Sequence, residues 1–91
     1  MRKVTRLTCE AFERGEVKSI GNTRTDGHGL YLHGNKIAEW REGEVYVSLA
    51  GWDTVTTRER LNGIDGCNVY RRKGVTYING IEFTEFWQRV V

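Results

Sequence analysis

The sequence predicts a small α+β protein, a single domain spanning residues 1–91, with five to seven short antiparallel strands in a sheet or meander and one or two short helices. Two observations favour this class. Runs of β-favouring residues flank two-residue turn signals such as Glu42-Gly43, Lys73-Gly74 and Asn79-Gly80, in a chain with 11 glycines and no proline. Helix start and stop signals, in contrast, bound only two short segments.

The segment 51–63 is predicted to contain the helix that joins two sheet units. Thr56 and Glu59 have capping-box spacing, in which the hydroxyl accepts from the N–H of Glu59 and the carboxylate reaches back to the N–H of Thr56. Gly63 would then end the helix in the left-handed conformation. Helix nucleation costs more than about two turns of hydrogen bonds return, so this helix must pack on a sheet.

The N-terminal part of the chain is predicted to contain a short helix and a strand. Residues 7–14 have near-helical apolar spacing, with Thr8 as the N-cap. Residues 17–25 follow as a strand that Gly21-Asn22 interrupts. The segment 26–29, Asp-Gly-His-Gly, is expected to be a tight turn because Asp-Gly favours the positive φ angles that a reversal needs.

Residues 30–48 are predicted to form two consecutive hairpins. A two-residue loop at Gly34-Asn35 places Leu32 opposite Ile37, whereas the hairpin that follows points Trp40 to the opposite face. The two hairpins therefore disagree about which face is buried. Either both faces of the sheet are covered or a β-bulge intervenes.

Residues 68–83 are predicted to form a three-stranded meander that turns at Lys73-Gly74 and Asn79-Gly80. Two-residue loops at both turns place one set of apolar side chains on a single face: Val69, Ile78, Ile81 and Phe83. The tail, residues 83–90, fits either a helix or a last strand, and both interpretations remain open.

The charges are nearly balanced, since 14 Lys and Arg against 12 Asp and Glu give a formal net charge of +2. This balance neither requires nor excludes nucleic acid. Cys9 and Cys67 do not form a disulfide framework, and no signal peptide or membrane span is found. We therefore expect a cytoplasmic protein that does not associate with a membrane.

No residue pattern indicates an enzyme, and we predict no catalytic residue, no metal and no cofactor. The soft ligand types, His28, His33, Cys9 and Cys67, lack the spacing that places two ligands on one metal ion. Glu59 is already assigned to the capping box, and the other carboxylates lie among basic residues as ordinary surface charges do.

A basic and aromatic surface is the first candidate site. Aromatic rings stack on bases and guanidinium groups pair with phosphates, so such a strip can follow a single strand of nucleic acid. Its predicted members lie on the third hairpin and on the preceding helix: Tyr70, Arg71, Arg72, Lys73, Tyr77, Arg58 and Arg60.

A small-ligand pocket near Trp52 and Trp40 is the second candidate, because such sites combine aromatic walls with a few convergent polar groups. A nucleotide would fit a pocket lined by Thr56, Thr57 and Asn62. Within the segment 51–63, capping explains Thr56 and Glu59 but does not explain Asp53, Thr57, Arg58 and Asn62.

Four stretches carry a resemblance to known proteins: Asn22-Thr23, residues 32–38, residues 51–63 and residues 77–80. The most specific is the pattern Trp-x-Thr-x-Thr-Thr-x-x-x-Leu-Asn-Gly, which begins at Trp52. In these stretches the chain resembles a group of small uncharacterised proteins encoded by tailed bacteriophages and prophages. The resemblance implies a phage origin, and hence the host cytoplasm, but no catalytic residues.

Three functions follow from these observations. The first is a non-enzymatic phage accessory protein that binds a host protein or protein complex stoichiometrically, for example to inhibit a bacterial defence system; this rests on analogy with other small phage proteins. The alternatives are nucleic-acid binding through the basic and aromatic hairpin, and a nucleotide sponge. Exposed sheet edges also make a homodimer a possible assembly.

Overall fold

The computed structural model describes residues 1–90, and these form the predicted α+β fold. The helices are α1 (Lys3–Arg14) and α2 (Val55–Leu61). The strands of the described residues number nine rather than five to seven: β1 (Val17–Ile20), β2 (Thr23–Asp26), β3 (Gly29–Leu32), β4 (Asn35–Arg41), β5 (Glu44–Val47), β6 (Val69–Arg72), β7 (Val75–Ile78), β8 (Ile81–Glu82) and β9 (Gln88–Arg89).

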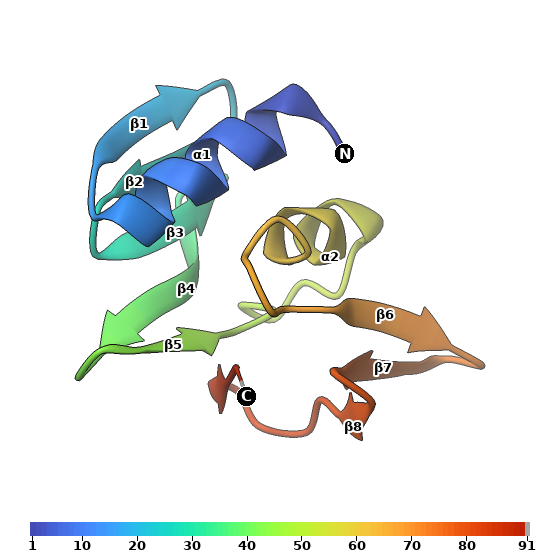
Figure 1. Ribbon diagram of the computed structural model, residues 1–91. Coiled ribbons are helices and arrows are strands. Elements are labelled where there is room, and N and C mark those ends of the chain that lie inside the picture. The colour runs from blue at the N-terminus through green and yellow to red at the C-terminus, as the bar shows by residue number, and fades with distance from the viewer. Residues whose placement is uncertain (91) are drawn as a thin grey trace.

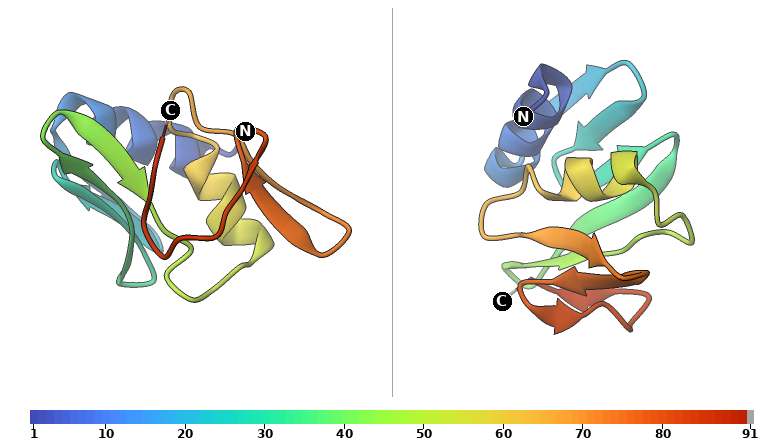
Figure 2. Two further views of the ribbon diagram at one scale, coloured as in Figure 1. Left: turned by 90° about the horizontal axis from the view of Figure 1, so that it is seen from below. Right: turned by 90° about the vertical axis from the view of Figure 1, so that its right-hand side faces the viewer.

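Two antiparallel sheets enclose α2. The larger has the order β1-β2-β3-β4-β5-β9 and the smaller the order β6-β7-β8. Helix α1 packs across β1, β2 and β3, whereas α2 contacts α1, β4 and β6. Figure 1 and the right-hand view of Figure 2 show α2 between α1 with the large sheet on one side and the small sheet on the other. The segment 51–63 thus joins the two sheets, as predicted.

Helix α1 begins earlier than its sequence signals indicate. It starts at Lys3, and Thr8 is an interior residue whose hydroxyl donates to Val4 O at 2.7 Å, so the predicted N-cap is wrong. The reason is tertiary, because the positions from Thr5 to Phe12 that face the sheet are all small or apolar and become buried. The helix ends at Gly15, which adopts φ 71°.

The large sheet contains one hairpin more than predicted, because Gly21-Asn22 turns the chain between β1 and β2 instead of interrupting one strand. The β3–β4 loop is His33-Gly34 rather than Gly34-Asn35, with Leu32 opposite Asn35. A β-bulge follows at Ile37, one of the two outcomes left open above. The bulge lets both Ile37 and Ala38 become buried.

The remaining hairpins have the predicted registers. Val45 pairs with Trp40 across β4 and β5, and Val69 pairs with Ile78 across β6 and β7. Ile81 pairs with Ile78 but is 55% exposed, because β8 is a two-residue edge strand. The open question of the tail is answered by β9, which pairs with β5.

Helix α2 is capped differently from the prediction. The N-cap is Thr54, whose hydroxyl accepts from the N–H of Thr57 at 3.1 Å, so the capping box of Thr56 and Glu59 is wrong. Gly63 is not left-handed either. It is needed for close approach to α1, since a Cβ there would lie 2.5 Å from Thr5 Cγ2.

The hydrophobic core lies between α1, α2 and the inner faces of both sheets. It includes both cysteines, which are buried free thiols. Its buried members are Cys9, Phe12, Leu30, Leu32, Ile37, Ala38, Val47, Leu61, Ile64, Cys67, Val69 and Ile78.

Candidate functional site

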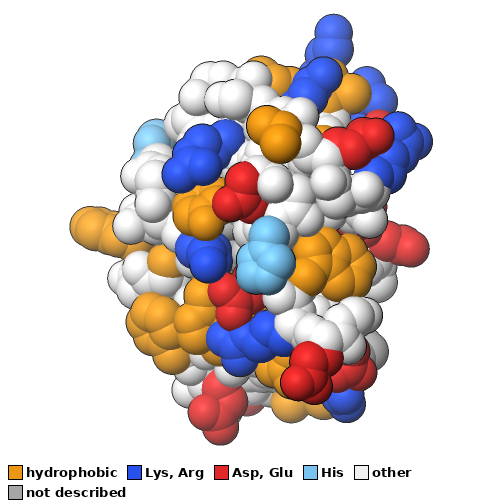
Figure 3. Space-filling model, turned by 90° about the vertical axis from the view of Figure 1, so that its left-hand side faces the viewer, with side chains coloured by type: hydrophobic (Ala, Val, Ile, Leu, Met, Phe, Trp, Pro, Cys, Tyr) orange, Lys and Arg blue, Asp and Glu red, His pale blue; other side chains and the backbone are white. Residues whose placement is uncertain are grey.

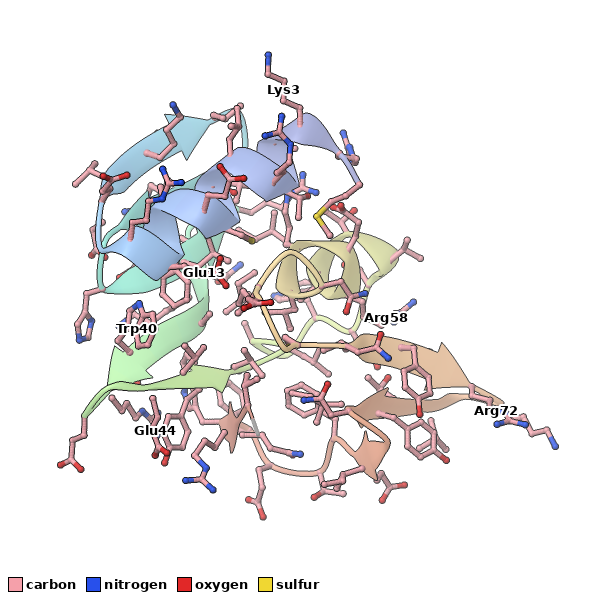
Figure 4. The ribbon with its side chains drawn as sticks, in the orientation of Figure 1. Lys3, Glu13, Trp40, Glu44, Arg58 and Arg72 are labelled. Atoms are coloured by element: carbon pink, nitrogen blue, oxygen red, sulfur yellow. The ribbon has the colours of Figure 1, made fainter. Side chains whose placement is uncertain are left out.

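The β6–β7 hairpin divides the predicted basic and aromatic residues between its two faces. Tyr70 and Tyr77 pair across the hairpin, and their rings stack with centroids 5.4 Å apart. Arg72 lies near the tip and points away from the body of the molecule (Figure 4), and Lys73 occupies the turn with φ 51°. Arg71 alternates to the opposite face, so the predicted strip is not continuous.

The two arginines of α2 do not extend this strip. Arg60 is only 1% exposed, and its guanidinium donates to Thr23 Oγ1 at 2.8 Å, to Thr5 Oγ1 at 2.9 Å and to Glu59 Oε1. Thr5 in turn donates to Glu59 Oε1 at 2.5 Å. Arg60 is therefore a core residue that ties α2 to α1 and β2, and its predicted place on a binding surface is wrong.

Asp53 connects the loop before α2 with that helix and with the small sheet. Its Oδ1 accepts from Arg58 and its Oδ2 accepts from Thr76, while Arg71 Nη1 lies 3.7 Å from Oδ2. Burial by itself would raise the pKa of the Asp53 carboxyl, but the hydrogen bonds from Thr76 and Arg58 outweigh it and hold the pKa below its usual value. The structure thus gives Asp53, Arg58 and Arg71 a structural contact.

Asn62 also has a structural partner. Its amide donates to Val69 O at 2.9 Å and accepts from Val69 N at 2.5 Å, which fixes the first residue of β6 against the end of α2. Both polar ends of the side chain are engaged with the backbone. The structure does not bring Asn62 into the same pocket as Trp52.

A pocket of about 420 Å³ does lie beside Trp52. Leu32, Ile37, Leu49 and Ala50 form its apolar floor and wall. Its polar lining comes from the β3–β4 turn and the first turn of α2: His33, Asn35, Thr54, Thr56 and Thr57. Trp40 is not part of it, because its ring stacks on Phe12 and its Nε1 donates to Phe12 O at 3.0 Å.

Around the same loop lies a group of apolar side chains that we call the Trp52 surface, consisting of Leu49, Ala50, Trp52, Val55 and Phe86. Trp52 is 62%, Val55 74% and Phe86 67% exposed. A second hollow, of about 370 Å³, separates the loop from the segment 83–86. The loop therefore stands between two hollows, with Trp52 lining one and Phe86 the other.

The outer face of the large sheet carries aromatic and basic residues that the sequence interpretation missed. Arg24 lies over the Tyr31 ring, 4.1 Å from its centroid, and Arg41 lies over the Tyr46 ring at 4.4 Å. Strict alternation with the buried positions of β2 would have indicated Arg24. Figure 3 shows that acidic, basic and apolar side chains are interspersed on one side of the molecule.

The profile of the Kyanoviridae Gp96 protein family matches residues 1–90, almost the full length of the chain. The chain belongs to that family. The family is a phage family, specifically of cyanophages, so the resemblance to small phage-encoded proteins is confirmed. No curated protein and no solved structure gives a significant match.

The cysteine thiols of this phage protein are buried. Burial raises the pKa of both the Cys9 and the Cys67 thiol to about 12, so both are fully protonated at neutral pH. Within residues 1–90, no three His, Cys, Asp or Glu side chains are grouped to hold a metal ion. Neither described helix is long and apolar enough to cross a bilayer.

Proposed function

We propose that this phage protein acts without catalysis, by binding a host protein stoichiometrically through the Trp52 surface. The observation that supports the proposal is the exposure of three large apolar side chains: Trp52 and Val55 near the start of α2, and Phe86 across the second hollow from the loop. Large apolar side chains left exposed on a small protein are a common mark of association sites. Trp is also the residue type most enriched among side chains that dominate the energy of protein interfaces.

The loop that presents Trp52 is held in place before any partner arrives. Ser48 Oγ accepts from Ala50 N at 2.9 Å, and Trp52 N donates to Leu49 O at 2.8 Å. Asp53 anchors the end of the loop to both α2 and β7. A preorganised loop loses little conformational entropy on binding, which favours affinity from a small contact area.

Covering a host enzyme or a bacterial defence complex is the biological effect we propose for this binding, within the host cytoplasm. The proposal takes its direction from the phage family and from the type of surface. Charges contribute little to it, because the apolar side chains of the Trp52 surface supply the contact. Binding is accordingly expected to persist at roughly 0.5 M salt, well above the concentration of about 0.15 M at which exposed charges are already screened beyond roughly 8 Å.

Affinity capture from cyanobacterial lysate tests the proposal, followed by reconstitution with the purified partner. Trp52→Ala and Phe86→Ala should each weaken retention, whereas Val17→Ala should retain the partner. Val17 is a matched control because it is also exposed, at 78%, but lies on the edge strand β1. Equal retention by all three variants, or a partner that dissociates at high salt, would contradict the proposal.

Nucleic-acid binding through the β6–β7 hairpin is the alternative. It is supported by the stacked Tyr70–Tyr77 pair, with Arg72 on the same face. The support is weaker than for the Trp52 surface, because Arg60 is buried and Arg71 faces Asp53. The tip offers only Arg72 and Lys73 to phosphates.

A further inference from the structure

We infer that the pocket beside Trp52 binds an uncharged planar heteroaromatic ring of nucleobase type, presented as a nucleoside or free base. The inference does not depend on the proposed protein binding: the pocket shares Leu49, Ala50 and Trp52 with the Trp52 surface, but its polar lining lies outside that surface. Its volume, about 420 Å³, lies in the range of roughly 300–1,000 Å³ found for small-molecule sites. The pocket is formed where the β3–β4 turn, the loop 49–52 and the start of α2 meet.

The pocket has the surfaces that a flat ring requires. Leu32 and Ile37 form a floor that is part of the rigid core, since they are only 5% and 1% exposed. Trp52 lines the pocket with an indole that is 62% exposed and so is available to stack. Stacking of a base on an aromatic side chain contributes about 1–3 kcal/mol and tolerates every base, because every base has a π-face.

Some polar groups that line the pocket already form hydrogen bonds within the protein, and others do not. The Thr54 hydroxyl is engaged, because it accepts from Thr57 N and bonds to the Thr57 hydroxyl at 2.9 Å. The Thr56 hydroxyl and the Asn35 amide, in contrast, have no hydrogen bond to any other side chain or backbone group in residues 1–90. An amide supplies both donors and an acceptor, which matches the mixed edge of a nucleobase.

Within residues 1–90, the lack of Lys and Arg in the pocket disfavours binding of a phosphate group. None of the described residues that line it is Lys, Arg, Asp or Glu. A phosphate would therefore lose hydration without gaining a counter-charge. This refines the sequence-based expectation of a nucleotide pocket: the predicted Trp52, Thr56 and Thr57 do line it, Asn62 does not, and the ligand class becomes the nucleoside rather than the nucleotide.

Calorimetric titration of the purified full chain with adenosine, guanosine, cytidine and uridine, each beside its 5′-monophosphate, tests the inference. At least one nucleoside should bind with a Kd below about 1 mM, the weak end of the affinity scale, and its monophosphate should bind no more tightly. Trp52→Ala should weaken binding about 10-fold, as loss of one stacking contact implies, whereas Trp52→Phe should largely restore it.

Two further variants separate this site from protein binding. Thr56→Val removes an unengaged hydroxyl and should weaken the nucleoside while leaving partner capture unchanged. Phe86→Ala should do the reverse, because Phe86 lines only the second hollow. The inference is overturned if no nucleoside binds at millimolar concentration, if the phosphates bind more tightly, or if the pocket accepts only an apolar side chain of a captured partner.

Discussion

Replacing Arg60, a buried residue that lies outside the Trp52 surface, should destabilise the protein strongly. The guanidinium is 1% exposed and serves Thr5, Thr23 and Glu59 at once. In Arg60→Met the aliphatic volume is kept, but the Glu59 carboxylate loses its cation, and its buried Oε2 already has no hydrogen-bond partner among residues 1–90. Removing one member of a buried ion pair costs roughly 3–5 kcal/mol.

The cost should fall at the lower end of that range, about 3 kcal/mol, because the Glu59 side chain is 27% exposed and keeps part of its hydration. For a domain of this size that corresponds to a fall of about 12–24 °C in Tm. Urea unfolding followed by circular dichroism measures it, and the m-value should stay unchanged because the same surface is exposed on unfolding.

Glu59→Gln combined with Arg60→Met supplies the internal check. The double variant has no unpaired charge, so it should be more stable than the sum of the two single losses implies, by about 1 kcal/mol or more. Arg72→Ala is the matched control at the exposed hairpin tip and should change stability by no more than about 0.5 kcal/mol. If Arg60→Met and Arg72→Ala unfold at the same urea concentration, Arg60 is not a buried link between α2, α1 and β2.

Two other predictions concern the small sheet. The pKa of Asp53 is lower in the folded protein than in the unfolded chain, so the wild-type advantage in stability over Asp53→Asn should be complete at neutral pH and shrink as the pH falls below about 4. Urea midpoints of both proteins between about pH 7 and about pH 2.5 measure this difference. A stability difference that stays constant over that range would contradict the contact. For nucleic acid, Arg72 and Lys73 provide about two phosphate contacts. A plot of the logarithm of the binding constant for a single-stranded probe against the logarithm of the salt concentration should therefore have a slope near about −1.4. A slope steeper than about −4 would show a larger basic surface than the hairpin presents.

The turns were the most predictable part of the fold, because each is determined by two adjacent residues. Lys73 and Asn79 adopt φ values of 51° and 50°, each followed by a left-handed glycine, as the sequence signals indicate. The His33-Gly34-Asn35 stretch shows the limit of such signals. It offers two overlapping turn pairs, and burial of Ile37 and Ala38 together through the bulge decides between them.

Helix α2 was predicted in the right place but with the wrong polar contacts. Thr54, Thr56 and Thr57 are all acceptable caps, and a local rule prefers Thr56 because Glu59 follows at the capping-box spacing. The structure engages Glu59 with Thr5, which lies 54 positions away in the sequence. A contact of that separation leaves no local pattern, and for the same reason the burial of Arg60 could not be inferred.

The candidate site was predictable in its location and not in its membership. Trp52 and the threonines after it were recognised because large aromatic and small hydroxyl residues cluster there. The opposite pocket wall comes from the β3–β4 turn, which the sequence signals placed one residue too late in the chain. Asn62 was assigned to the pocket because it lies on the same short helix, but its amide is used by the backbone of Val69.

Helix α2 has only seven residues, so the position of the loop before it depends on contacts from outside the helix. Arg60 fixes one side of the helix to α1 and β2, and Asp53 fixes the loop to β7. Variants of these two residues should therefore alter both the pocket and the Trp52 surface. Thr56 and Phe86 make no such link, so substitutions there separate ligand binding from partner binding without loosening the scaffold that both need.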